Sequence, residues 1–340
     1  MELMTEKNTI YGRLLEIQRM STEDGPGIRT TVFLKGCYLS CQWCHNPESI
    51  SFKPQLQWLK SICIGCQSCV SVCPNQALSF IEDEIIIDKN SCNADGICTE
   101  ECPSGALGLM GKDVSVDEVI KEVLKDKSFF EKSGGGVTLS GGEPTMQHDF
   151  VLAFFKKIKE NGIHTALDTC GMGVFASYEK LLPYTDLILY DIKEIDPEKH
   201  RQFTGHSNKK VLENLKLISE WMKISQIPKE LWIRTPIIPD ATGTEENLQG
   251  IGKFIYENEL HPSRWELCAF NNLCSDKYLR LGSPWLFEKH DLIAPEKMEH
   301  FLKTAKNSGV DKQIVFSTGP VKFLKNKLNE PYENETTFQS

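Results

Sequence analysis

The stretch "TTVFLKGCYLSCQWCHNPES", residues 30–49, joins a short apolar run to a loop that carries three cysteines. The apolar run, residues 30–35, contains β-branched residues and predicts a buried strand. Cys37, Cys41 and Cys44 follow it at spacings of four and three residues. Three thiolates are one too few for a closed structural zinc site and one too many for a disulfide. A metal group held here would therefore keep one coordination position open.

Two kinds of metal group suit such an incomplete ligand set. A cubane [4Fe-4S] cluster has four irons, and three protein thiolates leave one iron for a small molecule. Catalytic zinc also keeps an open position, but His45 follows Cys44 so closely that joint ligation would strain the loop. The spacing favours the iron–sulfur cluster and leaves zinc as the alternative.

The composition sets wider limits. The chain has 340 residues, of which 40% are hydrophobic, and this suits one large α/β domain with a small insertion. Its formal net charge of −9 argues against a nucleic-acid-binding surface, which is normally basic. No apolar run is long enough to span a membrane, and the first residues lack the apolar core of a secretory signal. We therefore expect a cytoplasmic protein that binds neither nucleic acid nor membrane.

Further apolar runs alternate with helical patterns along the chain. The additional predicted strands are residues 136–140, 163–168, 186–193, 231–238 and 264–270. The predicted helices are residues 116–126, 148–162, 209–223 and 244–259, with Gly162 as a C-cap and Thr244 starting a capping arrangement. Such alternation predicts parallel strands with crossover helices. Six strands are too few for a complete eight-stranded barrel, so we expect a partial (β/α)6 barrel with its chemistry at the C-terminal strand ends.

The cysteines are unevenly distributed, because ten of the 13 lie between Cys37 and Cys102. Residues 61–110 also contain seven acidic residues and a single base, Lys89. Disulfides are rare in a reducing compartment, so closely spaced cysteines indicate metal sites there. The shift in composition predicts that a module is inserted into the barrel. The expected segments are 1–52 and 113–318 for the barrel, 53–112 for the module and 319–340 for a peripheral tail.

The segment "CIGCQSCVSVCP", residues 63–74, has the C-x2-C-x2-C-x3-C-P spacing of bacterial ferredoxins. Its counterpart "CNADGICTEECP", residues 92–103, has Asp95 in place of the second cysteine. In two-cluster ferredoxins the fourth cysteine of each run ligates the other cluster. This crossed rule predicts two accessory [4Fe-4S] clusters, one on Cys63, Cys66, Cys69 and Cys102, and the other on Cys73, Cys92 and Cys98 with Asp95.

The C-x3-C-x2-C loop, with aromatic Trp43 before its third cysteine, resembles the signature of the radical S-adenosylmethionine (SAM) superfamily. More narrowly, "DGPGIRTTVFLKGC" (24–37) and "CHNPES" (44–49) resemble the activating enzymes of glycyl radical enzymes, and the resemblance runs from about residue 10 to 310. It implies that SAM chelates the open iron. One electron would then break a C–S bond to give methionine and a 5′-deoxyadenosyl radical, which takes hydrogen from a glycine of a partner enzyme.

The resemblance also assigns residues around SAM, and no catalytic side chain beyond the cluster and SAM. The turn "SGGEP" (140–144) would hold the amino group, with Glu143 receiving it; without the resemblance this is an ordinary Gly-Gly turn. Asn271 stands where relatives often carry a histidine beside the adenosyl group. Cys268 and Cys274, which flank it, are expected to be half-buried small residues. The expected cofactor-binding residues are Trp43, His45, Gly141, Gly142, Glu143, Asp168, Thr169, Asp191, Lys193, Arg234 and Asn271.

A carboxylate holds the iron of a cluster less durably than a thiolate does. We therefore expect the cluster with Asp95 to lose one iron on mild oxidation and to give a [3Fe-4S] form. The accessory clusters would either carry electrons from a flavodoxin or ferredoxin towards the catalytic cluster or stiffen a docking platform. The acidic surface of the module would steer a donor with a basic face.

The expected function is activation of a separate glycyl radical enzyme. The alternatives are a radical SAM enzyme that acts directly on a small metabolite or peptide, and a non-catalytic electron-transfer subunit. The resemblance implies that relatives with the insertion serve radical enzymes that break down choline, diols, hydroxyproline, sulfonates or aromatic compounds. It does not choose among these partners.

Overall fold

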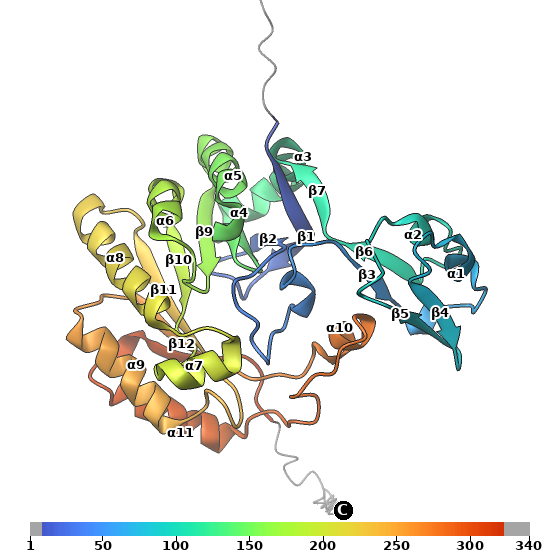
Figure 1. The fold of residues 1–340 in the computed structure, drawn as a ribbon. Helices are drawn as coiled ribbons and strands as arrows, with labels where there is room; N and C mark the ends of the chain where they lie inside the picture. The colour runs from blue at the N-terminus through green and yellow to red at the C-terminus, as the bar shows by residue number, and fades with distance from the viewer. Residues whose placement is uncertain (1–8, 323–340) are drawn as a thin grey trace, which may run out of the picture.

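The structure, a computed structural model, describes residues 9–322. The predicted tail, residues 319–340, therefore lies almost wholly outside the described residues. Figure 1 shows a curved central sheet with helices along its outer side and a smaller unit set apart from it. None of the helices between residues 9 and 322 combines the length and apolar character needed to cross a bilayer.

The central sheet contains nine strands. They are β1 (Tyr11–Ser21), β2 (Arg29–Leu34), β7 (Lys112–Ser115), β8 (Gly136–Gly141), β9 (His164–Thr169), β10 (Leu187–Asp191), β11 (Glu230–Ile237), β12 (Arg264–Ala269) and β13 (Val315–Thr318). Their order is β13-β12-β11-β10-β9-β8-β2-β1-β7, and no pairing among the described residues joins the two outer strands. From β13 to β2 all neighbours pair in parallel, whereas β1 is antiparallel to both β2 and β7.

All six strands predicted from the apolar runs are present, and all are parallel, so an α/β fold with a mostly parallel sheet is confirmed. The expected number is too small, because β13 adds a seventh parallel strand. The antiparallel strands β1 and β7 were not predicted either. These three strands leave several residues exposed at the side of the sheet, so their sequences lack a continuous apolar run.

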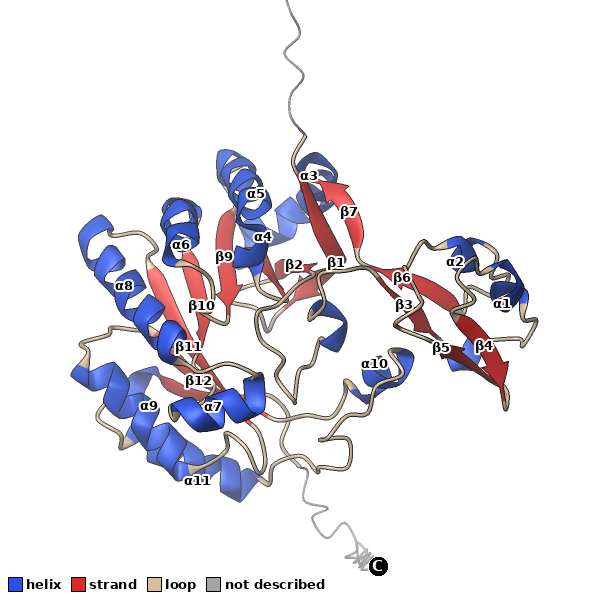
Figure 2. Ribbon diagram, in the orientation of Figure 1, coloured by secondary structure: helices blue, strands red, loops and turns tan. Residues whose placement is uncertain are grey.

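Most of the helices cover the outer face of the sheet, whereas the short helix α10 (Ser275–Arg280) lies between the sheet and the smaller unit, as Figure 2 shows. The helices in this part of the fold are α3 (Val116–Val123), α4 (Lys127–Ser133), α5 (His148–Glu160), α6 (Phe175–Leu181), α7 (Pro197–Thr204), α8 (Lys209–Ser225), α9 (Glu245–Glu257), α10 (Ser275–Arg280) and α11 (Pro295–Lys306). The four predicted helices are confirmed as α3, α5, α8 and α9. Thr244 caps α9 as expected, by accepting a hydrogen bond from the Asn247 amide at 3.2 Å.

The end of α5 differs from the prediction by one residue. Asn161 is the C-cap, and Gly162 follows it in the left-handed conformation, with φ of 70°. The Gly162 amide donates to the Lys159 carbonyl at 2.9 Å, and the Ile163 amide donates to the Ile158 carbonyl at 3.2 Å. This pair of bonds is a Schellman motif, in which glycine is favoured because it has no Cβ to strain.

Residues 55–110 form the smaller unit, which we call the cysteine-rich unit. It contains β3 (Gln55–Trp58), β4 (Leu78–Ile81), β5 (Glu84–Ile87), β6 (Leu107–Met110), α1 (Ser68–Val72) and α2 (Ile97–Glu100). Strands β3 and β6 pair where the chain enters and leaves, and β4 and β5 form a hairpin. A separate core of Leu56, Cys69, Leu78, Ile85, Cys98 and Leu107 holds the unit together. Lys112, which the predicted module included, already pairs with Leu14 in the central sheet.

Candidate active site at the carboxyl edge of the sheet

The three-cysteine loop leaves the C-terminal end of β2 and is fixed by backbone hydrogen bonds at both ends. The Cys37 amide donates to the Ile50 carbonyl at 3.0 Å, which closes the loop on itself. The amides of Ser40 and Gln42 donate to carbonyls in the last turn of α7, at 2.9 and 3.0 Å. The loop is therefore an ordered part of the sheet edge. Cys37, Cys41 and Cys44 are all half-buried in it.

Two thiols of this loop, those of Cys41 and Cys44, lie in a poorly hydrated environment. Burial raises the pKa of Cys41 to about 12, and burial raises the pKa of Cys44 as well, with Cys41 as its next cause. Such thiols stay protonated unless a cation stabilises the thiolate, and a bound metal does this. No three His, Cys, Asp or Glu side chains within residues 9–322 converge on one metal ion. A cubane does not require that convergence, because each thiolate binds a different iron. The donor set therefore fits the cluster.

The glycine turn after β8 packs directly against this loop. Gly141 has φ of 106°, and a Cβ there would lie 2.3 Å from the Leu34 carbonyl oxygen. A Cβ on Gly142 would lie 2.0 Å from the Gly36 carbonyl oxygen. Both positions therefore require glycine, since any side chain would push the turn away from the cysteine loop.

The predicted contact of Glu143 with the amino group of SAM stays a prediction, and the structure shows where this side chain lies. Its side chain is fully buried and faces the protein interior rather than a cavity. The carboxylate accepts hydrogen bonds from the Thr145 hydroxyl at 2.7 Å, the Thr169 hydroxyl at 2.9 Å and the Cys170 amide at 2.8 Å. These donors fix the orientation of the carboxylate. The Thr169 hydroxyl, which was also predicted to border SAM, points at Glu143.

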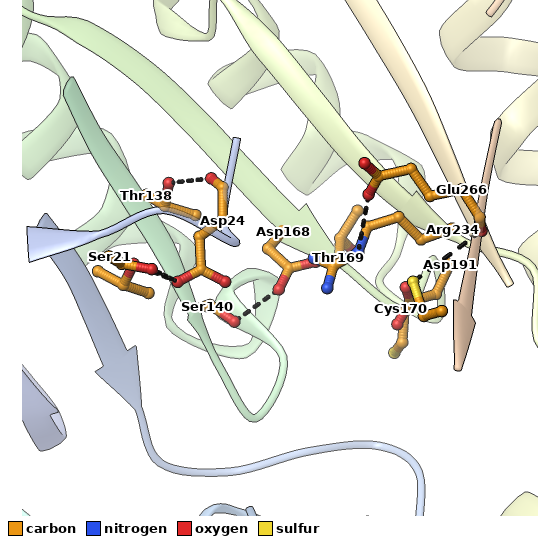
Figure 3. Close-up of polar contacts among 12 residues, drawn as sticks. Ser21, Asp24, Thr138, Ser140, Asp168, Thr169, Cys170, Asp191, Arg234 and Glu266 are labelled. Carbon is orange, nitrogen blue, oxygen red and sulfur yellow. Dashed lines mark hydrogen bonds and ion pairs between the residues drawn. The ribbon is translucent and has the colours of Figure 1, made fainter. Parts of the chain in front are cut away.

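A row of charged and polar side chains crosses the C-terminal strand ends, as Figure 3 shows. The Ser140 hydroxyl donates to Asp168 at 2.7 Å, and Arg234 donates to the other oxygen of Asp168 at 3.3 Å. Arg234 also lies 3.9 Å from the Glu266 carboxylate. Arg234, which lies inside an apolar strand, is therefore paired with acidic side chains. Asp168 joins β9 to β11 in this row.

The electrostatics of the row follow from its burial. Burial raises the pKa of Asp168 to about 6, although Arg234 acts in the opposite direction. Burial also lowers the pKa of Arg234, but Asp168 and further acidic neighbours, among them Asp191, together raise it overall. Nearby, the Lys193 ammonium lies 2.5 Å from Asp191. Burial lowers the pKa of Lys193, but Asp191 and the neighbouring thiols together raise it overall. Both cations therefore stay charged.

Two neighbouring cavities, which share Arg234 and Cys268 in their linings, open over this row. The smaller one, of about 250 Å³, is lined by side chains of the cysteine loop together with Asp191, Lys193 and Arg234. The larger one, of about 970 Å³, extends past Arg234 to the sheet rim at Glu23 and Thr318. The predicted residues that line them are Cys41, Trp43, Cys44, His45, Asp191, Lys193, Arg234 and Asn271.

Three residues near these cavities, Asp24, Glu266 and Cys268, were not predicted as site residues. Cys268 is half-buried as expected, but it lines both cavities, whereas Cys274 is buried. Glu266 is a buried carboxylate in β12. Its position inside an apolar strand pattern is the sequence feature that could have identified it as a site residue. Asp24, from the "DGPG" segment, accepts hydrogen bonds from Ser21 and Thr31, both at 2.6 Å.

The remaining cysteines gather in the cysteine-rich unit. Burial raises the pKa of Cys98 to about 11, and Cys92, Cys73 and Asp95 lie close enough to raise it further. A second neighbourhood contains Cys66, Cys69 and Cys102, whose thiols act on one another electrostatically. Cys63 packs against the same small core as Cys69 and Cys102.

The comparisons with known proteins agree on one family. The model of the radical SAM superfamily matches residues 31–246. The trans-4-hydroxy-L-proline dehydratase activating enzyme of Clostridioides difficile is 37% identical over 88% of this chain and 98% of its own. The isethionate sulfite-lyase activating enzyme of Oleidesulfovibrio alaskensis is 41% identical over 80% of this chain and 88% of its own. The indoleacetate decarboxylase activating enzyme of Tractidigestivibacter scatoligenes is 36% identical over 91% of this chain and 98% of its own.

Among solved structures, a radical SAM methyltransferase from Sphaerobacter thermophilus matches 90% of this chain and 76% of its own, with a TM-score of 0.50 and 10% identity. This likeness concerns the fold alone. The superfamily implies a [4Fe-4S] cluster and SAM as cofactors, which removes zinc as the alternative for the three-cysteine loop. By its sequence, this chain belongs to the radical SAM superfamily, as an activating enzyme of a glycyl radical enzyme.

Proposed function

We propose that this activating enzyme serves a glycyl radical enzyme of the dehydratase, lyase or decarboxylase group, acting on a hydroxyproline, diol, choline, sulfonate or aromatic substrate. The observation that carries the proposal is the identity of 36–41% with activating enzymes of one dehydratase, one lyase and one decarboxylase. The identities are too similar to choose among the three reactions. Direct action on a small metabolite or peptide is not favoured, because these relatives are named as activators of other enzymes.

When bound, the reduced cluster and SAM supply a 5′-deoxyadenosyl radical that takes hydrogen from the partner glycine. We assign Cys37, Cys41 and Cys44 as the cluster ligands, of which Cys41 and Cys44 line the smaller cavity. Lys193 and Asp191 flank the place where the carboxylate and ribose of SAM would lie. The larger cavity, which reaches the rim at Glu23 and Thr318, suits entry of a protein loop, because its open side admits a chain rather than enclosing a metabolite.

We further propose that the cysteine-rich unit, as a ferredoxin-like insertion, holds two accessory clusters. Support comes from the two neighbourhoods of cysteines, which follow the crossed rule of ligation. Cys66 is exposed, whereas Cys92 lines a cavity of about 260 Å³ between the unit and Leu281. We therefore propose that the electron donor, a flavodoxin or ferredoxin, docks on the side of Cys66. Electrons would leave for the catalytic cluster on the side of Cys92.

The partner is identified by direct activation. The reduced enzyme and SAM are mixed anaerobically with purified hydroxyproline dehydratase, isethionate sulfite-lyase or indoleacetate decarboxylase, and the glycyl doublet is sought by electron paramagnetic resonance. We expect a doublet with one partner of this group and none when its radical-bearing glycine is replaced by alanine. Turnover of a small metabolite by this chain alone, with no doublet in any mixture, would contradict the proposal.

The role of Lys193 is tested by Lys193→Met. We expect about tenfold weaker SAM binding, because a charge-assisted contact to the carboxylate is lost and Asp191 is left uncompensated. Equilibrium binding to the cluster-loaded protein measures this. Lys199→Met, at an exposed position of α7, is the matched control and should bind normally. Equal affinity in both variants would remove Lys193 from the site.

The electron-carrying role is tested by Cys66→Ala. We expect this variant to slow reduction of the catalytic cluster by a protein donor more than reduction by dithionite, because only the protein donor uses the accessory clusters. The rates are followed by paramagnetic resonance, with Ser71→Ala on the exposed side of α1 as the control. Equal slowing with both reductants would favour the docking-platform role.

The role of Asp95 is tested by mild oxidation. We expect a three-iron signal from the native protein, because the carboxylate releases its iron readily, and none from Asp95→Cys. Iron analysis and paramagnetic resonance of the oxidised proteins provide the measurement. A native protein that keeps every cubane iron would show that Asp95 does not weaken the cluster.

A further inference from the structure

Helix α10 lies against the three-cysteine loop, although more than 200 residues separate them in sequence. The Tyr278 hydroxyl donates to the carbonyl oxygen of Cys44 at 2.9 Å. The Lys277 ammonium donates to the Asn46 side chain at 2.7 Å and lies 2.7 Å from the Glu48 carboxylate. Two consecutive residues of α10 thus contact the backbone and side chains of residues 44–48.

These contacts are largely shielded from water. Tyr278 is 9% exposed and stacks on Trp285, with ring centroids 5.3 Å apart and an angle of 16°. Glu48 is 7% exposed, so its charge needs the Lys277 cation beside it. Phe287, further along the same segment, packs on Trp43 at 6.5 Å. The segment therefore holds the cysteine loop on two sides.

The same segment also meets the cysteine-rich unit. The Lys89 ammonium donates to the Ser283 hydroxyl at 2.8 Å. Leu281 lines the cavity between the segment and the unit, opposite Cys92. Figure 1 shows α10 between the central sheet and this unit. Residues 274–287, which we call the bridging segment, thus connect the neighbourhood of Cys92 with the backbone of Cys44.

We propose that the bridging segment couples the cysteine-rich unit to the catalytic cysteine loop, with Lys277 and Tyr278 as positioning residues that raise the reduction potential of the catalytic cluster. The inference rests on the proposed function in placing that cluster on Cys37, Cys41 and Cys44. Neither residue touches SAM or a reacting atom in this arrangement. They act through the Cys44 carbonyl and through Glu48.

The physical reason is the charge that reduction adds. A cluster that accepts one electron becomes more negative, and its potential depends on nearby charges and hydrogen bonds. Lys277 provides a fixed cation and also neutralises Glu48, whose unpaired carboxylate would oppose the added electron. The Tyr278 hydroxyl donates a hydrogen bond to the backbone carbonyl of the ligand Cys44 and thereby withdraws electron density from it. Both effects favour the reduced cluster.

The test is a redox titration of the catalytic cluster, followed by paramagnetic resonance on the full-length, cluster-loaded protein. We expect Lys277→Met to shift the midpoint potential to a more negative value and Lys277→Arg to restore it. Tyr278→Phe should give a smaller shift in the same direction, because the ring still stacks on Trp285. Leu279→Ala, at an exposed position of α10, is the control and should leave the potential unchanged.

A second measurement tests the coupling to the cysteine-rich unit. Lys89→Met removes the contact to Ser283 and should slow reduction of the catalytic cluster by the protein donor, without shifting its midpoint potential. Iron content and circular dichroism identify any variant that fails to fold or load. Native potentials in loaded Lys277→Met and Tyr278→Phe, or a native rate in Lys89→Met, would overturn the inference. These outcomes leave the proposed function intact, whereas absence of SAM cleavage by the native protein would overturn that function instead.

Discussion

The buried carboxylate of Glu143 is the constraint on which the geometry of the site depends. A charge without access to water is costly unless donors surround it, and here Thr145, Thr169 and the Cys170 amide supply them. The carboxylate therefore holds the end of β8 against the end of β9. The adjoining glycine turn can then approach the cysteine loop closely, because no Cβ stands between the two backbones. Strands, turn and metal loop become one rigid edge.

On this edge, charged side chains lie where the [4Fe-4S] cluster and SAM would meet. Asp168, Arg234 and Glu266 compensate one another across three strands, and Lys193 pairs with Asp191 beside the cysteine loop. Such pairs keep their charge in a poorly hydrated cavity, since each ion has an opposite neighbour. They need little reorganisation when a charged ligand arrives. Charges that are already in position suit the binding of SAM, which carries both positive and negative groups, and its reductive cleavage.

In the proposed function, electron transfer and radical chemistry occupy separate parts of the molecule. The cysteine-rich unit has its own core, and Lys89 is one of the side chains through which it contacts the rest of the chain. The bridging segment, which Lys89 contacts at Ser283, also contacts the backbone of Cys44 through Tyr278. An insertion can thus be added to the fold without disturbing the sheet edge. Its influence on the catalytic cluster then depends on a short segment that follows β12.

The sequence by itself determined the α/β class, six of the seven parallel strands and the three-cysteine loop, because periodicity and spacing are local properties. It gave no sign of β1, β7 and β13, whose exposed residues interrupt any apolar run. Only the tertiary structure decided that Glu143 faces inward and that α10 contacts residues 44–48. Those features arise from chain segments far apart in sequence, and their donors, acceptors and volumes meet only when the sheet is assembled.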